Sequence, residues 1–241
     1  MHTYGESETE DEIRAQSVQF VAALTGENPT SLVVKLGSPQ EEVADYASQS
    51  SMDLIVAGTH GRTGSEHLLM GSVAESIARR THCPLVVVKP NAKTFTRVQN
   101  SEIQRVLCAM DVNELDQSVI DAAALLASIL GAELDLLHVT FAAERKLGPI
   151  TDYQVSPVEV VQDQERLRRA NSNIRGIELR THQLIGEPVN QVVQFVNQQE
   201  PDILVLGTHN RTGLRRLFGS VSESVMRQVS CPVMLIKTDS E

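Results

Sequence analysis

Hydrophobic positions fall into short apolar runs separated by amphipathic stretches along the chain. The runs are 32–36, 54–57, 85–89, 105–110 and 134–139, and each is mostly apolar, as buried strands are. Apolar residues recur at helical spacing in 7–24, 115–130 and 158–172, whereas 142–157 contains Gly148 and Pro149 and is expected to be a loop. Apolar strands that alternate with helices predict a parallel α/β sheet covered on both faces.

One long pattern occurs twice. Asp53 to Lys89 and Asp202 to Lys237 each read as an apolar strand, a glycine-rich turn, a helix and a second apolar strand. Gly58 and Gly207 lie 149 residues apart and Cys83 and Cys231 lie 148 apart, so the second copy has lost one residue between these landmarks. Because this period is far too long for a solenoid, the repeat predicts two domains of one kind in tandem.

The two copies differ in extent. We expect a first domain at 1–90, a polar linker at 91–104 and a second domain with five strands at 105–241. The first domain holds only the last three of these strands, because the counterpart of Val106 would fall about 43 residues before Met1. The missing strands favour a chain that begins inside a longer protein over a naturally incomplete domain, since three parallel strands leave an unprotected sheet edge.

Composition narrows the function classes. The formal charge is −10 and aromatic residues make up 3% with no Trp, so nucleic acid is a poor candidate as the main partner. No run approaches the roughly 20 apolar residues of a membrane span, and residues 1–12 are too acidic and polar for a signal peptide. With three cysteines a disulfide framework is not expected, so we expect a cytoplasmic protein that does not engage membranes.

The glycine-rich turn carries the main candidate chemistry. Gly58-x-x-Gly61, followed after nine residues by Gly71-Ser72, lies between a strand and a helix, where open α/β sheets bind ligands. Glycines there let backbone N–H groups approach a phosphate at the helix N-terminus. However, Ser72 and Ser220 each precede a Glu by three residues, as in a helix-capping box. The pattern alone therefore supports phosphate binding and helix capping equally.

The repeated block resembles the universal stress protein family in its tandem form. The resemblance rests on Asp-Leu-Ile-Val-x-Gly-Thr-His-Gly-Arg-Thr-Gly, then Gly-Ser-Val-Ala-Glu-Ser, then Cys-Pro-Leu-Val-Val-Val-Lys. It implies two doubly wound parallel-sheet domains (Rossmann-like, adenine nucleotide α-hydrolase-like) in tandem, the first incomplete, with pairing through the last strand. It also implies that Gly-x2-Gly-x9-Gly-Ser/Thr holds the phosphates and ribose of ATP, as in nucleotide-binding members.

The two copies match the family's nucleotide-binding residues to different extents. The first copy matches the phosphate loop in full, whereas in the second copy Asn210 replaces a glycine and the spacer is eight residues long. Asp111 corresponds to the acidic residue expected near the ribose and adenine, and Val139 to the adenine-side wall. The expected nucleotide-binding residues are Gly58, Gly61, Gly71, Ser72, Asp111, Val139, Gly207, Asn210, Gly219 and Ser220. Neither copy carries every element of the site.

The sequence leads to two main hypotheses. The first is a cytoplasmic universal stress protein that binds ATP or AMP, with or without Mg²⁺, as a regulatory ligand in stress adaptation. The alternative is a scaffold without nucleotide that acts through a protein partner or a second copy of itself. An enzyme such as a slow ATPase ranks last, because no general base can be named. We expect His60 and His209 to be hydrogen-bonded turn residues, and Cys83, Cys108 and Cys231 to pack in the core.

Overall fold

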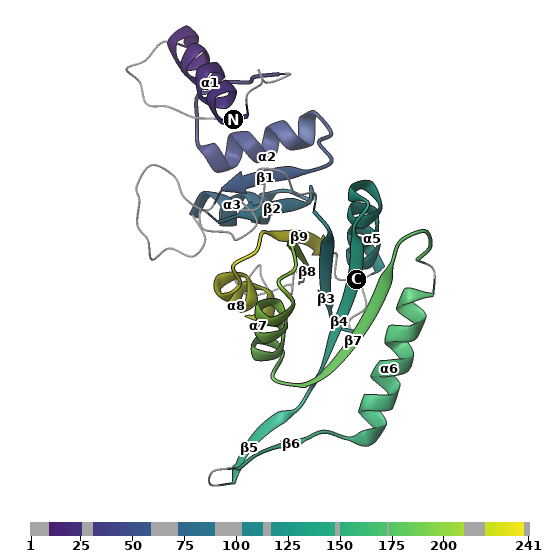
Figure 1. Cartoon of the computed structure of the whole chain (residues 1–241). Coiled ribbons are helices and arrows are strands. Elements are labelled where there is room, and N and C mark those ends of the chain that lie inside the picture. Colours follow the sequence, from purple (N-terminus) through teal and green to yellow (C-terminus); the bar gives the residue numbers. More distant parts are fainter. Residues whose placement is uncertain are drawn as a thin grey trace.

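The computed structural model describes residues 10–25, 31–58, 72–89, 103–112, 117–147, 150–172, 174–209 and 220–238. These residues form one seven-stranded sheet in the order β1-β2-β9-β8-β3-β4-β7 and a separate two-stranded sheet of β5 and β6 (Figure 1). The strands are β1 (Ile55–Gly58), β2 (Leu85–Val88), β3 (Arg105–Met110), β4 (Glu133–Phe141), β5 (Ala143–Leu147), β6 (Ile150–Gln154), β7 (Leu179–Gly186), β8 (Ile203–His209) and β9 (Val233–Thr238).

The C-terminal part of the sheet is a doubly wound α/β fold, as the sequence predicts. Strands β9, β8, β3, β4 and β7 are hydrogen-bonded in this order, and every neighbouring pair is parallel. Within these five strands, β3 is central and comes first in the sequence. The next two strands, β4 and β7, lie on one side of it, and β8 and β9 lie on the other side. The strand order therefore reverses between β3 and β8.

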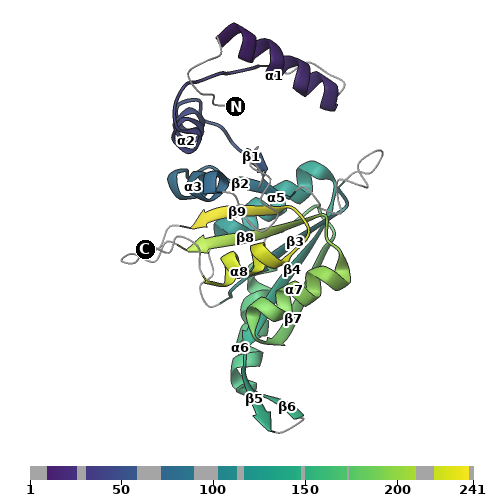
Figure 2. The same ribbon diagram turned by 90° about the vertical axis from the view of Figure 1, so that its left-hand side faces the viewer.

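Helices cover both faces of the sheet (Figures 1 and 2). The described helices are α1 (Glu10–Thr25), α2 (Pro39–Gln49), α3 (Ser72–Arg80), α5 (Gln117–Leu130), α6 (Pro157–Asn171), α7 (Pro188–Gln199) and α8 (Ser220–Gln228). Apolar residues of α2, α3, α7 and α8 form one core cluster with the sheet, and those of α5 and α6 form another. Gly131 ends α5 with a φ of +63°, the left-handed conformation expected of a C-terminal glycine. Among the described residues, no helix has the length and apolar character needed to cross a membrane.

The two copies of the repeat meet through their last strands. β2 and β9 pair in antiparallel register, with Val86 opposite Met234, which joins the N-terminal strands β1 and β2 to the C-terminal five. Two equivalent lysines reach across this junction. Lys89 Nζ donates to Met226 O at the end of α8 at 2.7 Å, and Lys237 Nζ lies 3.4 Å from Arg79 O at the end of α3. Pairing through the last strand, expected from the resemblance, is confirmed within one chain.

Two expectations for secondary structure are wrong. Residues 32–36 form no strand, although they are apolar, because no described segment pairs with them. In the second copy the equivalent residues belong to β7, which bonds to β4 along its whole length. The stretch 142–157, interpreted as a loop, contains the antiparallel pair β5 and β6, with Ala143 opposite Gln154. Gly148 and Pro149 lie between these two strands in the sequence and outside the described residues, and the flanking strands are not predicted.

Candidate functional site

The carboxyl ends of β3 and β8 form the topological switch point of the sheet. Ligands of open α/β sheets settle at such points, because the loops on the two sides diverge there. Ala109 is paired with Leu206, so Met110 and Asp111 come next to Gly207 and Thr208 where the strands end. The Asp111 side chain is exposed at this edge, while Val112 is buried. Thus Asp111 and Gly207, both predicted site residues, are brought to one edge of the sheet.

His138 lies beside the end of β3, on the neighbouring strand β4. Its ring is 2% exposed, and its Nδ1 lies 3.2 Å from Met110 O and 3.4 Å from Val112 N. On the other side of the ring, Nε2 lies 3.0 Å from Asp163 Oδ2 on α6. One buried side chain therefore links the end of β3 to a helix.

The carboxylate of Asp163 is the centre of a larger buried network. Thr140 Oγ1 donates to Asp163 Oδ2 at 2.9 Å, and Arg166 approaches Asp163 Oδ1 at 3.4 Å from the solvent side. Gln183 on β7 donates to Thr140 Oγ1 at 3.0 Å and to Val160 O at 2.9 Å. The network thus ties β3, β4, β7 and α6 together beneath the switch point, and each buried polar atom has a partner.

This network was missed at the sequence level. His138 lies within the apolar run 134–139 and Asp163 within the amphipathic stretch 158–172, and the sequence pattern singles out neither. A usable signal did exist, since a histidine within a run of buried apolar strand residues needs a hydrogen-bond partner. The sequence could not name that partner, because Asp163 lies 25 residues away on another element.

Gly207 has a packing reason to be glycine. A Cβ at this position would lie 3.0 Å from Val119 Cγ2 of α5 and 3.4 Å from Thr238 Cγ2. Its carbonyl accepts a hydrogen bond from Ser222 Oγ at 2.7 Å, which holds the first turn of α8 against the end of β8. At the equivalent Gly58, no atom of the described residues lies within 4 Å of a Cβ. Within the described residues, close packing therefore requires glycine at 207 and not at 58.

The remaining predicted residues are only partly described. Val139 is 9% exposed and packs in the core cluster on the α7 face of the sheet. The described part of α3 begins at Ser72 and that of α8 at Ser220, and the choice between helix capping and phosphate binding stays open there. Glu75 and Glu223 accept hydrogen bonds from Arg79 and Arg227, one turn further along. Gly61, Gly71, Asn210, Gly219 and His60 lie outside the described residues, as do the side chains of Ser72, Ser220 and His209.

Two of the three cysteines are buried, as expected. Cys108 is fully buried on β3 and Cys231 is 4% exposed, and burial raises the pKa of each thiol to about 12. Cys83 is half-buried, and its Sγ donates to Met52 O at 3.0 Å. Within the described ranges, no group of three or more His, Cys, Asp or Glu side chains is arranged to hold a metal ion.

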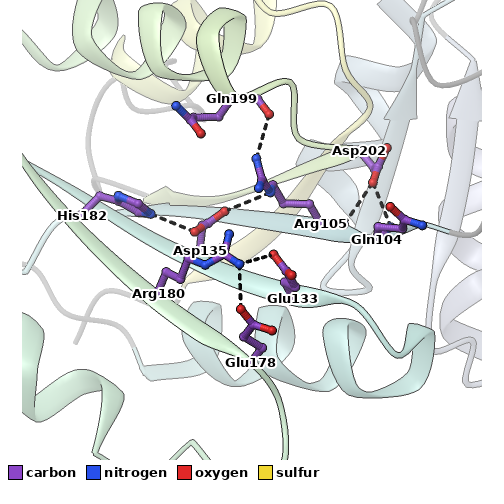
Figure 3. A network of polar contacts seen from close by, with 9 residues as sticks. All are labelled: Gln104, Arg105, Glu133, Asp135, Glu178, Arg180, His182, Gln199 and Asp202. Atoms are coloured by element: carbon purple, nitrogen blue, oxygen red, sulfur yellow. Dashed lines mark hydrogen bonds and ion pairs between the residues drawn. The ribbon is translucent and has the colours of Figure 1, made fainter.

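A second polar network lies at the opposite edge of the sheet, where β3, β4 and β8 begin (Figure 3). Asp202 accepts from the backbone N–H of Gln104 and Arg105, and the Arg105 guanidinium donates to Gln199 O at the end of α7. Asp135, 3% exposed, binds Arg105 Nε at 3.5 Å and His182 Nε2 at 2.8 Å. A cavity of about 300 Å³ at this edge is lined by Gln104, Arg105, Glu133, Gln199, Glu200 and Asp202. Because the charged groups here bind one another and the end of α7, we interpret them as contacts that hold α7 against the strand starts.

The sheet order and the switch point define a doubly wound α/β architecture, and comparison with known sequences defines the family. The sequence profile of the universal stress protein family matches residues 2–89 and 102–237. This covers most of the chain in two segments, so the chain belongs to the universal stress protein family.

Individual relatives agree with this assignment. The chain is 47% identical over 57 residues to a universal stress protein of Methanocaldococcus jannaschii, a match that covers 24% of this chain and 34% of the relative. It is 26% identical over 202 residues to a universal stress protein of Mycobacterium tuberculosis, covering 83% of this chain and 66% of the relative. The chain therefore spans less than two thirds of the length of either curated relative.

Solved structures share the overall fold. A universal stress protein from Archaeoglobus fulgidus superposes with a TM-score of 0.62 at 21% identity, covering 95% of this chain and 76% of that one. A Pseudomonas aeruginosa protein assigned to the same family gives a TM-score of 0.66 at 16% identity, covering 97% of this chain and 80% of its own. At these identities the likeness concerns the arrangement of strands and helices.

Proposed function

We propose that this universal stress protein binds an adenine nucleotide, ATP or AMP, as a regulatory ligand at the β3–β8 switch point. The observation that carries the proposal is the position of Asp111, exposed at the carboxyl end of β3 and next to Gly207 at the end of β8. A carboxylate at this place can accept hydrogen bonds from ribose hydroxyls. The N-terminus of α8, which follows β8, carries unpaired N–H groups suited to phosphates.

The C-terminal copy is the better candidate of the two, despite its altered loop. A switch point needs two neighbouring parallel strands whose connections diverge, and among the described residues only β3 and β8 provide one. In the first copy β1 is the terminal strand of the sheet and has a described neighbour only in β2. Gly58 to Ser72 match the family loop in full, whereas Asp111 belongs to the second copy.

A thermal-shift measurement tests this function. A ligand that binds only the folded protein stabilises it by about 2.7 kcal/mol at 100 times its Kd. For a chain of this size that corresponds to a rise in Tm of roughly 5–10 °C. We expect ATP or AMP to produce this rise in the wild type, and Asp111→Ala to lower the affinity. Parallel titrations with and without Mg²⁺ decide whether the metal ion contributes.

A matched pair of variants locates the site. Gly71 and Gly219 occupy equivalent positions before the two helices, and a valine at either one would block approach of a phosphate to the loop. We expect Gly219→Val to abolish the nucleotide shift and Gly71→Val to leave it. The reverse result would move the site to the first copy. A wild type that shows no shift with any adenine nucleotide would contradict nucleotide binding altogether.

A scaffold without nucleotide remains the second candidate, and the free side of β1 favours it. Leu54 and Val56 at the end of the sheet are 40% and 64% exposed. Exposed apolar side chains on a terminal strand are suited to protein contacts. This function predicts that the purified protein releases no nucleotide on denaturation and shows no thermal shift, while Val56→Lys weakens its association with a protein partner or a second copy.

A further inference from the structure

The two peptide groups that flank Asp111 both contact one ring nitrogen. Met110 O belongs to the peptide bond before Asp111, and Val112 N belongs to the one after it. His138 Nδ1 lies 3.2 Å from the first and 3.4 Å from the second. Met110 and His138 are also paired in the register of β3 and β4, so the ring lies directly beside the end of β3. The backbone conformation at Asp111 is thereby coupled to the state of this imidazole.

The other ring nitrogen, Nε2, binds Asp163. Asp163 Oδ2 accepts from Thr140 Oγ1, and Oδ1 faces the Arg166 guanidinium. An ionised carboxylate only accepts hydrogen bonds, so His138 Nε2 must carry a proton to bind it at 3.0 Å. In the neutral ring, Nδ1 is then an acceptor and binds the Val112 N–H. In the protonated ring, Nδ1–H donates to Met110 O instead.

We propose that His138 is a positioning residue for the nucleotide site: Asp163 orients its ring, and its Nδ1 holds the Met110–Val112 backbone so that Asp111 faces the ribose. This inference rests on the nucleotide function proposed above and assigns to the buried network a role in affinity. Of the charged groups near the ring, Asp163 on α6 contacts it directly, and Arg166 on the same helix contacts the other oxygen of Asp163. Asp111 follows Met110 in the sequence, and its side chain is exposed. On α5, Asp121 is exposed and accepts from Gln117.

Two amide substitutions separate the two ends of the ring. In His138→Asn the terminal polar atoms lie one bond beyond Cγ, as Nδ1 does, so the contact with the β3 backbone can persist. In His138→Gln they lie one bond further out, as Nε2 does, so the contact with Asp163 can persist instead. If Nδ1 positions Asp111, then Asn retains AMP affinity within about threefold and Gln loses roughly 5- to 10-fold, the equivalent of one hydrogen bond. Affinity is measured by calorimetry, and the Tm of each variant without ligand is recorded separately.

A merely structural role predicts a different order. If His138 serves only to fasten α6, Gln preserves the fastening contact and binds AMP at least as well as Asn, or the affinity losses follow the losses in Tm. Either result in a wild type that binds AMP overturns this inference and leaves the nucleotide function standing. A wild type that binds neither AMP nor ATP overturns both, and if only ATP binds, the same comparison of variants is made with ATP.

Asp163→Asn provides a second route should a His138 variant fail to fold. The amide removes the requirement for a proton on Nε2, and the proton can move to Nδ1. We expect ¹⁵N NMR of the imidazole to show a protonated Nε2 and an unprotonated Nδ1 in the neutral wild-type ring, and a changed proton distribution in Asp163→Asn, with AMP affinity lowered about 3- to 10-fold. Addition of AMP to the wild type should shift the Nδ1 resonance. Unchanged affinity in Asp163→Asn despite a changed ring, or an Nδ1 resonance that does not respond to AMP, would contradict the proposal.

Discussion

The three cysteine side chains differ in solvent exposure. Burial raises the pKa of Cys108 and of Cys231 to about 12. Burial also raises the pKa of Cys83, and the Asp53 carboxylate raises it further, but this side chain is only half-buried. The thiolate is the reactive form, so all three thiols are poor nucleophiles near pH 8 and two of them are also shielded from solvent.

We therefore expect a thiol reagent at pH 8 to label one cysteine per native chain, slowly, and all three after denaturation. Cys83→Ser should abolish labelling of the native protein without a large change in Tm. Labelling is read by mass spectrometry of the intact chain. Rapid native modification of Cys108 or Cys231 would contradict the buried packing that the structure gives them.

The same pKa shifts set the direction of one pH effect. The thiol pKa values of Cys108 and Cys231 are raised in the folded state, so their contribution to stability is complete below the unfolded pKa near 9. Above that pH the unfolded chain releases these protons and the folded chain keeps them up to about 12. The free energy of unfolding should therefore fall as the pH rises through this window.

At the scale of single residues, the sequence indicates which side chains are buried far better than what they bind. The apolar runs predict the buried environment of Cys108 and Cys231 correctly, whereas Cys83, expected to be buried as well, is only half-buried. His138 and Asp135 lie in the same kind of run, yet their partners Asp163 and His182 are 25 and 47 residues away. Such pairs become visible only when the strand order and the helix positions are known.

Elements were predictable where the local pattern and the tertiary partners agree. The strand at 105–110 coincides with β3, and the helices expected at 115–130 and 158–172 correspond to α5 and α6. The prediction fails for 32–36, an apolar segment that forms no strand because the described chain offers it no neighbour. Strand propensity reflects packing on a sheet more than an intrinsic backbone preference, which explains why the more polar equivalent residues 181–185 form β7 beside β4 in the second copy.

The end of α8 receives a cation from the other copy of the repeat. Lys89 Nζ, which follows β2, donates to Met226 O at 2.7 Å and to Val229 O at 2.5 Å. A cation at a helix C-terminus compensates the partial negative charge of the last carbonyl groups. The equivalent Lys237 makes a weaker contact with α3, a single one at 3.4 Å. The junction of the two copies is therefore fastened more strongly on the α8 side.

This difference makes Lys89→Met and Lys237→Met a matched pair, since methionine keeps the apolar stem and removes the ammonium. We expect Lys89→Met to lower the free energy of unfolding by about 1–2 kcal/mol, and Lys237→Met by less than about 0.5 kcal/mol. Denaturant unfolding followed by circular dichroism measures both. Equal losses would mean that the carbonyl contacts of Lys89 contribute nothing beyond those of Lys237.

At the scale of the whole molecule, the two copies share one sheet but have different surroundings. β2 and β9 pair at the junction, and helices α2 and α3 cover the first copy on the same face that α7 and α8 cover in the second. On the other face, α5 packs against β3, β4, β8 and β9, and no described helix lies over β1. The repeat in the sequence predicts the shared fold, but not which of two equivalent residues is buried.

Val56 and Val205 show this asymmetry most directly. They are separated by the repeat offset and occupy the same place on β1 and β8, yet Val56 is 64% exposed and Val205 is fully buried under α5. Threonine has the shape of valine, so a Val→Thr change tests burial with little change in volume or strand propensity. A hydroxyl in the apolar environment of Val205 loses its hydrogen bonds to water, whereas at Val56 it stays hydrated.

We expect Val205→Thr to lower the free energy of unfolding by about 1–3 kcal/mol and Val56→Thr to change it by less than about 0.5 kcal/mol. For a chain of this size the first loss corresponds to a fall in Tm of roughly 3–9 °C, measured by circular dichroism melting. Similar losses at both positions would mean that the outer face of β1 is covered in solution, by another chain or by residues outside those described. That result would favour a protein contact at β1 and give the scaffold function its first direct support.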